Sequence, residues 1–146
     1  MKIELKLDEN CTETNVIIVA KIMTEEIQAL LERLSYEAPQ GIVGFDGESI
    51  SLLEPTEIVR IYAAVGKVFA VTEKKEFGLR LRLYEIEERL NGKGFVRISN
   101  SEIINIKKAK KFDLSMAGTI RVSLSNGNVC FVSRRYVAKI KKILGV

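Results

Sequence analysis

The sequence predicts an α+β fold, in which a mainly antiparallel β domain with short helices follows a small β-β-α appendage. Apolar runs of strand length recur after residue 41 at intervals of about 8–12 residues, with turn residues between them. Few segments have the spacing of a helix. The chain has 146 residues, of which 47% are hydrophobic and 29% charged, so it can bury a core without disulfides or metals.

Residues 1–38 form the predicted appendage, which is a candidate dimerisation or interaction unit. Apolar and charged residues alternate over residues 1–7, which is typical of a half-buried strand, and a β-branched run at residues 16–20 indicates a second strand. Thr24 is the predicted N-cap of an amphipathic helix over residues 25–36.

The β domain spans residues 42–146 and is separated from the appendage by a linker at residues 38–41, which contains proline and glycine. A short helix is predicted over residues 83–90, and Ser133 is expected to cap a last helix over residues 134–144. The predicted strands are residues 42–46, 49–53, 58–64, 67–72, 76–81, 95–99, 106–112, 119–123 and 129–132.

The composition argues against an enzyme. The chain contains no histidine, which excludes Ser-His-Asp and Cys-His catalysis and every histidine-ligated metal. Cys11 and Cys130 are isolated in sequence, so we expect two reduced thiols, with Cys130 in a core. No catalytic residue, metal, cofactor or small-molecule substrate is predicted. Charges at every second position of the first eight residues argue against a signal peptide, and we expect a cytoplasmic protein.

Charge is distributed unevenly along the chain. Residues 1–90 hold 11 Lys/Arg and 17 Asp/Glu, whereas residues 91–146 hold 12 Lys/Arg and 2 Asp/Glu. A basic half of this kind favours a polyanionic partner, although lysines also serve solubility.

Two basic segments are candidates for phosphate contact. The first contains Lys107, Lys108, Lys110 and Lys111, and it could equally be an edge strand that lysines keep soluble. The second is the last helix, where cations line one side and two arginines occupy the first turn, against the helix dipole.

Three motifs resemble the LytTR DNA-binding domain and occur in the family's order. They are Leu53-Glu54-Pro55-Thr56-Glu57-Ile58, the run FVRISNSEIINI at residues 95–106, and a hairpin with the sequence SLSNGN at residues 123–128 that leads to VSRRY at residues 132–136. The resemblance spans roughly residues 43–146. Residues 1–38 are similar to the strand-strand-helix lead-in of small stand-alone members.

The resemblance implies a ten-stranded, mostly antiparallel fold that binds double-stranded promoter DNA through loops in the major groove. By position, it implies base contacts from the Val65-Gly66-Lys67 loop, through Lys67, and from Ser99, Asn100 and Arg135. The asparagine amide suits adenine and the guanidinium suits guanine. The remaining predicted contacts go to phosphates, from Ser101, Lys107, Lys108, Lys110, Lys111, Arg134 and Lys139. Arg97 and Asn105 are expected to hold backbone in place.

The resemblance also implies partners. Such regulators usually act as homodimers on repeated half-sites, and some stand-alone members are restrained by an inhibitory membrane protein. Two alternatives remain open from the residues: an RNA-binding β domain, and a protein or ligand interaction module whose basic face meets an acidic partner.

Overall fold

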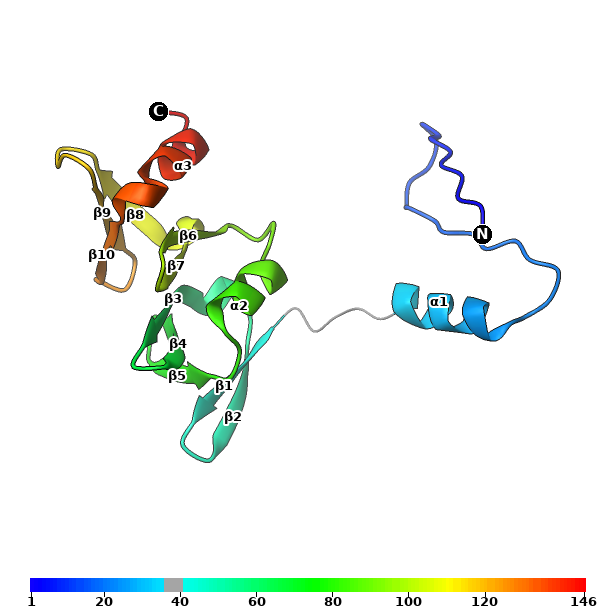
Figure 1. Ribbon diagram of the computed structural model, residues 1–146, viewed down its shortest axis with the longest axis horizontal. Coiled ribbons are helices and arrows are strands. Elements are labelled where there is room, and N and C mark those ends of the chain that lie inside the picture. Colours follow the sequence, from blue (N-terminus) through cyan, green and yellow to red (C-terminus); the bar gives the residue numbers. More distant parts are fainter. Residues whose placement is uncertain (36–40) are drawn as a thin grey trace. The chain divides into compact units, whose positions relative to one another are not determined.

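The computed structural model describes residues 1–35 and 41–146 and divides the chain into two compact units, residues 1–38 and 39–146 (Figure 1). Most of the expected linker, and the last expected residue of the first helix, lie outside the described residues. Within the described ranges, no helix is both long and apolar enough to cross a membrane.

The described residues of the first unit contain one helix, α1 (Glu25–Ser35), which has Thr24 before it as the expected N-cap. The Ile27 amide donates to Thr24 Oγ1 over 3.2 Å, and Glu25 and Glu26 occupy the first turn. The two strands predicted before this helix are not formed, because residues 1–7 and 16–20 are irregular and almost wholly exposed. A two-stranded hairpin is at best marginally stable when no further layer packs on it. No such layer covers residues 1–7 and 16–20 in this unit.

The second unit has the predicted α+β architecture, with ten strands in two antiparallel sheets. Its strands are β1 (Ile42–Asp46), β2 (Ser49–Leu53), β3 (Ile58–Ala64), β4 (Lys67–Thr72), β5 (Glu76–Leu79), β6 (Phe95–Ser99), β7 (Glu102–Asn105), β8 (Ala109–Asp113), β9 (Ile120–Leu124) and β10 (Val129–Val132). Its helices are α2 (Leu83–Arg89), α3 (Arg134–Leu144) and the 3₁₀ turns η1 (Pro55–Glu57) and η2 (Ile106–Lys108).

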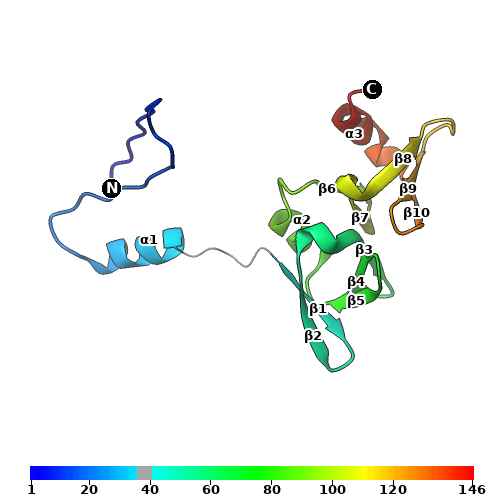
Figure 2. The same ribbon diagram turned by 180° about the vertical axis from the view of Figure 1, so that it is seen from behind.

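The seven-stranded sheet has the order β2-β1-β5-β4-β3-β7-β6, and the three-stranded sheet has the order β10-β9-β8. Helix α2 lies beside the larger sheet, and α3 lies at the end of the smaller one next to β6 (Figure 2).

The strand predicted over residues 106–112 was wrong in both position and extent. Residues 102–105 form β7, residues 106–108 form η2, and only then does β8 begin. Strand β7 lacks the alternating pattern of a half-buried strand, because Ile103 and Ile104 are both fully buried. The Asn105 side chain accepts a hydrogen bond from the Lys107 amide over 3.1 Å and so caps η2.

Two hydrophobic cores meet at β3 and β7. Ile61 and Ile103 belong to the core under α2, whereas Val59 and Ile104 belong to the core shared with β8–β10 and α3. Side chains of successive strand residues point to opposite faces, so both strands contribute to both cores. These two strands therefore fix the smaller sheet against the larger one.

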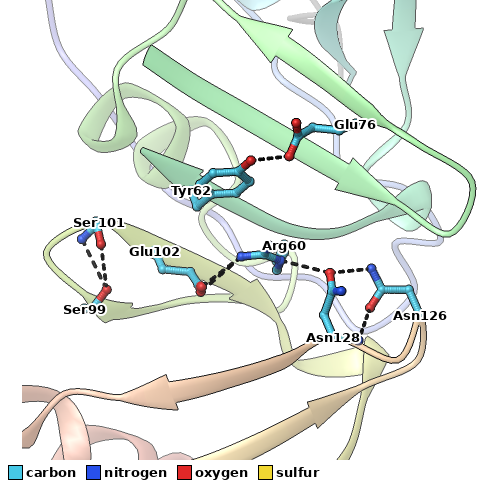
Figure 3. Close-up of polar contacts among 8 residues, drawn as sticks. All are labelled: Arg60, Tyr62, Glu76, Ser99, Ser101, Glu102, Asn126 and Asn128. Atoms are coloured by element: carbon cyan, nitrogen blue, oxygen red, sulfur yellow. Dashed lines mark hydrogen bonds and ion pairs between the residues drawn. The ribbon is translucent and has the colours of Figure 1, made fainter. Parts of the chain in front are cut away.

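A polar bridge also joins the two sheets (Figure 3). The Arg60 guanidinium donates over 3.1 Å to Glu102 on β7 and over 3.1 Å to Asn128, which follows the β9–β10 turn. Cys130 is buried beside this bridge, as predicted, and burial together with Glu102 raises the pKa of its thiol to about 12. The thiol is thus protonated at neutral pH.

Asn105 gives a direct test of how β7 is held. Its amide donates to the Ile58 carbonyl over 2.9 Å, and only 2% of the residue is exposed. We predict that Asn105→Ala lowers the free energy of unfolding by about 1–3 kcal/mol, because buried backbone groups lose their partners. Urea denaturation measures this loss. The exposed Asn91→Ala is the control, with an expected change within about 0.5 kcal/mol; equal effects of the two substitutions would contradict the assignment.

Candidate functional site

Three segments from distant parts of the sequence lie at one edge of the second unit. They are the β3–β4 turn, the β6–β7 turn and the junction between β10 and α3. The Ala63 amide on β3 donates to the Ser101 carbonyl over 2.8 Å, and the Ser133 amide donates to the Ile98 carbonyl over 2.9 Å. Backbone hydrogen bonds therefore connect the middle segment to both of the others.

The β3–β4 turn presents an exposed valine in an unfavourable backbone conformation. Ala64 pairs with Lys67, which leaves Val65 and Gly66 as a two-residue turn with φ of 50° and 72°. Positive φ suits glycine but costs a β-branched residue about 1–3 kcal/mol. The Val65 side chain is 99% exposed, so burial in this chain does not offset the cost. Lys67, on the strand side of the same turn, is exposed as well.

The β6–β7 turn is held by Arg97. Its guanidinium donates to the Ser99 carbonyl over 2.7 Å and to the Asn100 carbonyl over 2.6 Å, and it pairs with Glu87 of α2 at 2.9 Å. All three acceptors are engaged by a single planar group, which fixes the turn relative to α2. The expectation that Arg97 holds backbone agrees with this geometry.

Side chains at this turn are partly organised by one another (Figure 3). The Ser101 amide donates to Ser99 Oγ over 3.2 Å, and the two hydroxyl oxygens are 3.4 Å apart. Ser99 is half-buried, whereas Asn100 and Ser101 are exposed. The Asn100 amide side chain is thus presented to solvent from a turn whose backbone is tied down.

The junction between β10 and α3 presents two arginines. Ser133 occupies the N-cap position predicted for it, but its hydroxyl makes no capping hydrogen bond. Arg134 lies against Gly118 in the β8–β9 loop, and Arg135 is exposed with its guanidinium 6.0 Å from the Tyr136 ring centre. The first turn of α3 contains no acidic residue. This helix end therefore combines free amide groups with two cations, an arrangement that favours an anion.

Electrostatics distinguish this edge from the rest of the chain. The three segments, residues 64–67, 99–101 and 133–135, contain three cations and no acidic residue. Lys139 lies one turn further along α3 and is exposed. Glu102, the nearest acid in sequence, is half-buried and paired with Arg60. An anionic surface could approach the edge without meeting an unpaired carboxylate from these segments.

The lysine run of residues 107–111 is not brought to this edge as a group. Ser99 and Glu102 pair at one end of β6 and β7, whereas Phe95 and Asn105 pair at the other, and Lys107 and Lys108 follow Asn105. Strand β8 then pairs with β9, with Lys110 at a shift in the pairing register and Lys111 opposite Ser123. A strand over residues 106–112 would place these lysines alternately on its two faces. Because residues 106–108 form η2, this arrangement does not occur.

Val65 lies in the loop that the resemblance places in base contact, but Lys67 was the residue of that loop named as the contact. The available signal was a β-branched residue directly before glycine, in a two-residue hairpin turn where asparagine, aspartate or glycine is preferred. No group of three or more residues that could hold a metal ion occurs in the described part of the chain.

The LytTr DNA-binding domain model matches residues 48–145, which include all three segments. The chain belongs to the LytTR family. The match begins after β1, covers most of the second unit and leaves out the first.

Curated relatives extend the likeness over the whole chain. HTH-type transcriptional regulators named as uncharacterized, from Staphylococcus aureus strains NCTC 8325 / PS 47 and COL, are each 31% identical over 147 residues, covering 100% of this chain and 99% of their own. A solved structure described as the LytTr DNA-binding domain of a methyl-accepting/DNA response regulator from Bacillus cereus is 22% identical. It covers 73% of this chain and 97% of its own, with a TM-score of 0.70, and shows that the fold of this LytTR domain is shared.

The geometry of Arg97 predicts how the β6–β7 turn responds to substitution. Arg97→Lys keeps the charge but loses the planar fork that bonds two carbonyls at once. We expect hydrogen exchange of the Ala63 amide, whose acceptor is Ser101, to accelerate about tenfold, since the turn opens more readily. NMR-detected exchange measures this. Arg89→Lys on the exposed end of α2 is the matched control; an unchanged Ala63 rate in Arg97→Lys would show that the turn does not depend on the fork.

Proposed function

We propose that this chain is a sequence-specific regulator of transcription that binds double-stranded promoter DNA through the edge formed by the β3–β4 turn, the β6–β7 turn and the start of α3. DNA-binding regulation of transcription is the function of the family to which the chain belongs. The observation that carries the finer proposal is the common edge, with its exposed amide, two exposed arginines and lack of acids.

Two side chains have the chemistry for base recognition. The Asn100 amide presents a donor and an acceptor side by side, which matches the adenine edge in the major groove. The Arg135 guanidinium presents a fork of donors, which matches guanine. Ser99 and Lys67 belong to the same edge and have the weaker base contacts in this proposal. Val65 adds an apolar contact, for which the thymine methyl group is the suitable partner.

Phosphate contacts in this proposal come from side chains around Asn100 and Arg135. Arg134, Lys139 and Ser101 lie at or next to the edge and set its position on the duplex. The lysines of residues 107–111 follow the other end of β7, so the DNA phosphates that they contact in this proposal flank the recognised bases. This is a loop-based mode of binding. Helices α2 and α3 are separated in sequence by five strands and do not form a helix-turn-helix pair.

Regulation of promoters by this mode implies further partners. We propose that the chain acts as a homodimer on repeated half-sites, in the cytoplasm, without catalytic activity. Residues 1–38 are the proposed interaction unit, because the LytTr match begins at residue 48 and leaves them free for another role. An inhibitory membrane protein is a second proposed partner of the chain.

Individual roles at the edge are separable by mutation. We predict that Asn100→Ala lowers the affinity for the preferred duplex roughly tenfold or more and removes the preference at one base position. Lys139→Ala removes a phosphate contact and weakens binding to all duplexes alike. Selection from random duplexes, followed by titration, measures both; identical behaviour of the two variants would refute the division into base readers and phosphate contacts.

Salt dependence tests the partner class. If about six phosphates are contacted, duplex affinity should fall roughly a thousandfold between 50 and 200 mM salt, because condensed counterions are released on binding. Titrations with duplex DNA, single-stranded RNA and an acidic peptide across this range distinguish the classes of partner. A shallow dependence with duplex DNA, or tighter binding of the RNA, would contradict the proposal.

A further inference from the structure

The first eight residues form an unpartnered segment with two different sides. Ile3, Leu5 and Leu7 are each more than 80% exposed. Lys2 Nζ lies 2.9 Å from Glu4 Oε1, which puts charged residues two positions apart on the same side. Alternation in an extended chain therefore gives this segment one apolar side and one charged side.

The order of charges on this segment is complementary to itself. When two copies of residues 1–8 run antiparallel and are centred on Leu5, Lys2 faces Asp8 and Glu4 faces Lys6. Each pair occurs twice by two-fold symmetry, so four opposite-charge pairs form. Ile3 faces Leu7 on the other side, and the two Leu5 side chains meet at the axis.

Neighbouring registers lack this match. Centring the pair on Glu4 opposes Lys2 to Lys6 and Glu4 to its own copy, while centring it on Lys6 opposes Glu4 to Asp8. Like charges directly opposite each other are destabilising in an antiparallel pair, and opposite charges are stabilising. Registers centred on Ile3 or Leu7 form only two opposite-charge pairs, so the register centred on Leu5 has the most of them.

We propose that residues 1–8 pair in this register with the same residues of a second copy of the chain and form the centre of a homodimer. The pairing rests on the proposed function. Its role is to bring two DNA-binding edges into one dimer, which can then bind repeated half-sites. A two-fold interface of this kind uses the same surface on both copies.

The rest of the first unit can complete this dimer. A turn is already formed at residues 8–11, where the Cys11 amide donates to the Asp8 carbonyl over 3.1 Å, so residues 16–20 can fold back as an outer strand. Two copies then supply four strands, whereas one copy supplies only two, which is too few for a stable sheet. The apolar side of α1, with Ile27 and Leu30, provides a layer to cover the apolar face. This accounts for strands that the sequence predicts and the single chain does not form.

Single charge reversals test the register on the full-length chain. In Glu4→Lys a lysine opposes Lys6 twice, and in Lys6→Glu a glutamate opposes Glu4 twice. Each variant should weaken dimerisation about tenfold or more, as measured by sedimentation without DNA. An equimolar mixture of the two variants should dimerise again, and so should the double variant Glu4→Lys/Lys6→Glu. Lys21→Glu, an exposed charge outside the segment, is the control and should leave dimerisation unchanged.

Several results would overturn the pairing: a wild-type monomer at tens of micromolar, single variants that dimerise like the wild type, or a mixture that stays monomeric. Binding to a duplex carrying one half-site, selected from a random pool by the wild type, is measured in parallel and should be the same for all variants. A wild-type chain that stays monomeric but binds the half-site refutes only the pairing. Dimerisation without any duplex binding refutes only the proposed function.

Discussion

The structure of the DNA-binding unit depends on the burial of β3 and β7 between two hydrophobic cores. Ile103 and Ile104 point to opposite faces of the same strand, and each enters a different core. Because neither strand has a solvent-facing side at these positions, the smaller sheet and the larger sheet cannot shift independently. The Arg60 bridge to Glu102 and Asn128 crosses the same boundary.

This arrangement gives the proposed DNA-binding edge its rigidity. The turns after β3 and β6 begin within a few residues of the positions that are buried on both faces. Helix α3 begins directly after β10, which contributes to the same core as Val59 and Ile104. Loops that extend from a rigid scaffold can hold side chains in fixed relative positions without a recognition helix. Arg97 adds local order by tying the carbonyls of Ser99 and Asn100 to α2 through Glu87.

Much of this unit was predictable from the sequence, for physical reasons that differ by element. Strands β3, β4, β6 and β10 and helix α3 occur at their predicted bounds, since turn residues that separate apolar runs mark the strands and helical spacing marks α3. Strand β7 was missed because burial on both faces removes alternation, and η2 because its cap is the single residue Asn105. The strands before α1 were predicted from correct local patterns, but a pattern does not tell whether a pairing partner exists within one chain.

The candidate site was predictable in its residue types more than in its assembly. Asn100, Arg134 and Arg135 were named from the chemistry of base and phosphate recognition and from the family resemblance. That the two turns and the start of α3 share one edge follows from strand order, which depends on tertiary pairing. The strained turn at Val65 also needed coordinates, because backbone dihedral angles are not visible in a sequence.

The central claim is that three separate segments form one DNA-binding edge, and amide chemical-shift mapping with duplex DNA tests it most directly. The account predicts that signals of residues 64–67, 99–101 and 133–135 shift together at the same DNA concentration, with larger changes than those at Lys107 and Lys108. Shifts confined to one of the three segments, or centred on the opposite end of β7, would contradict it.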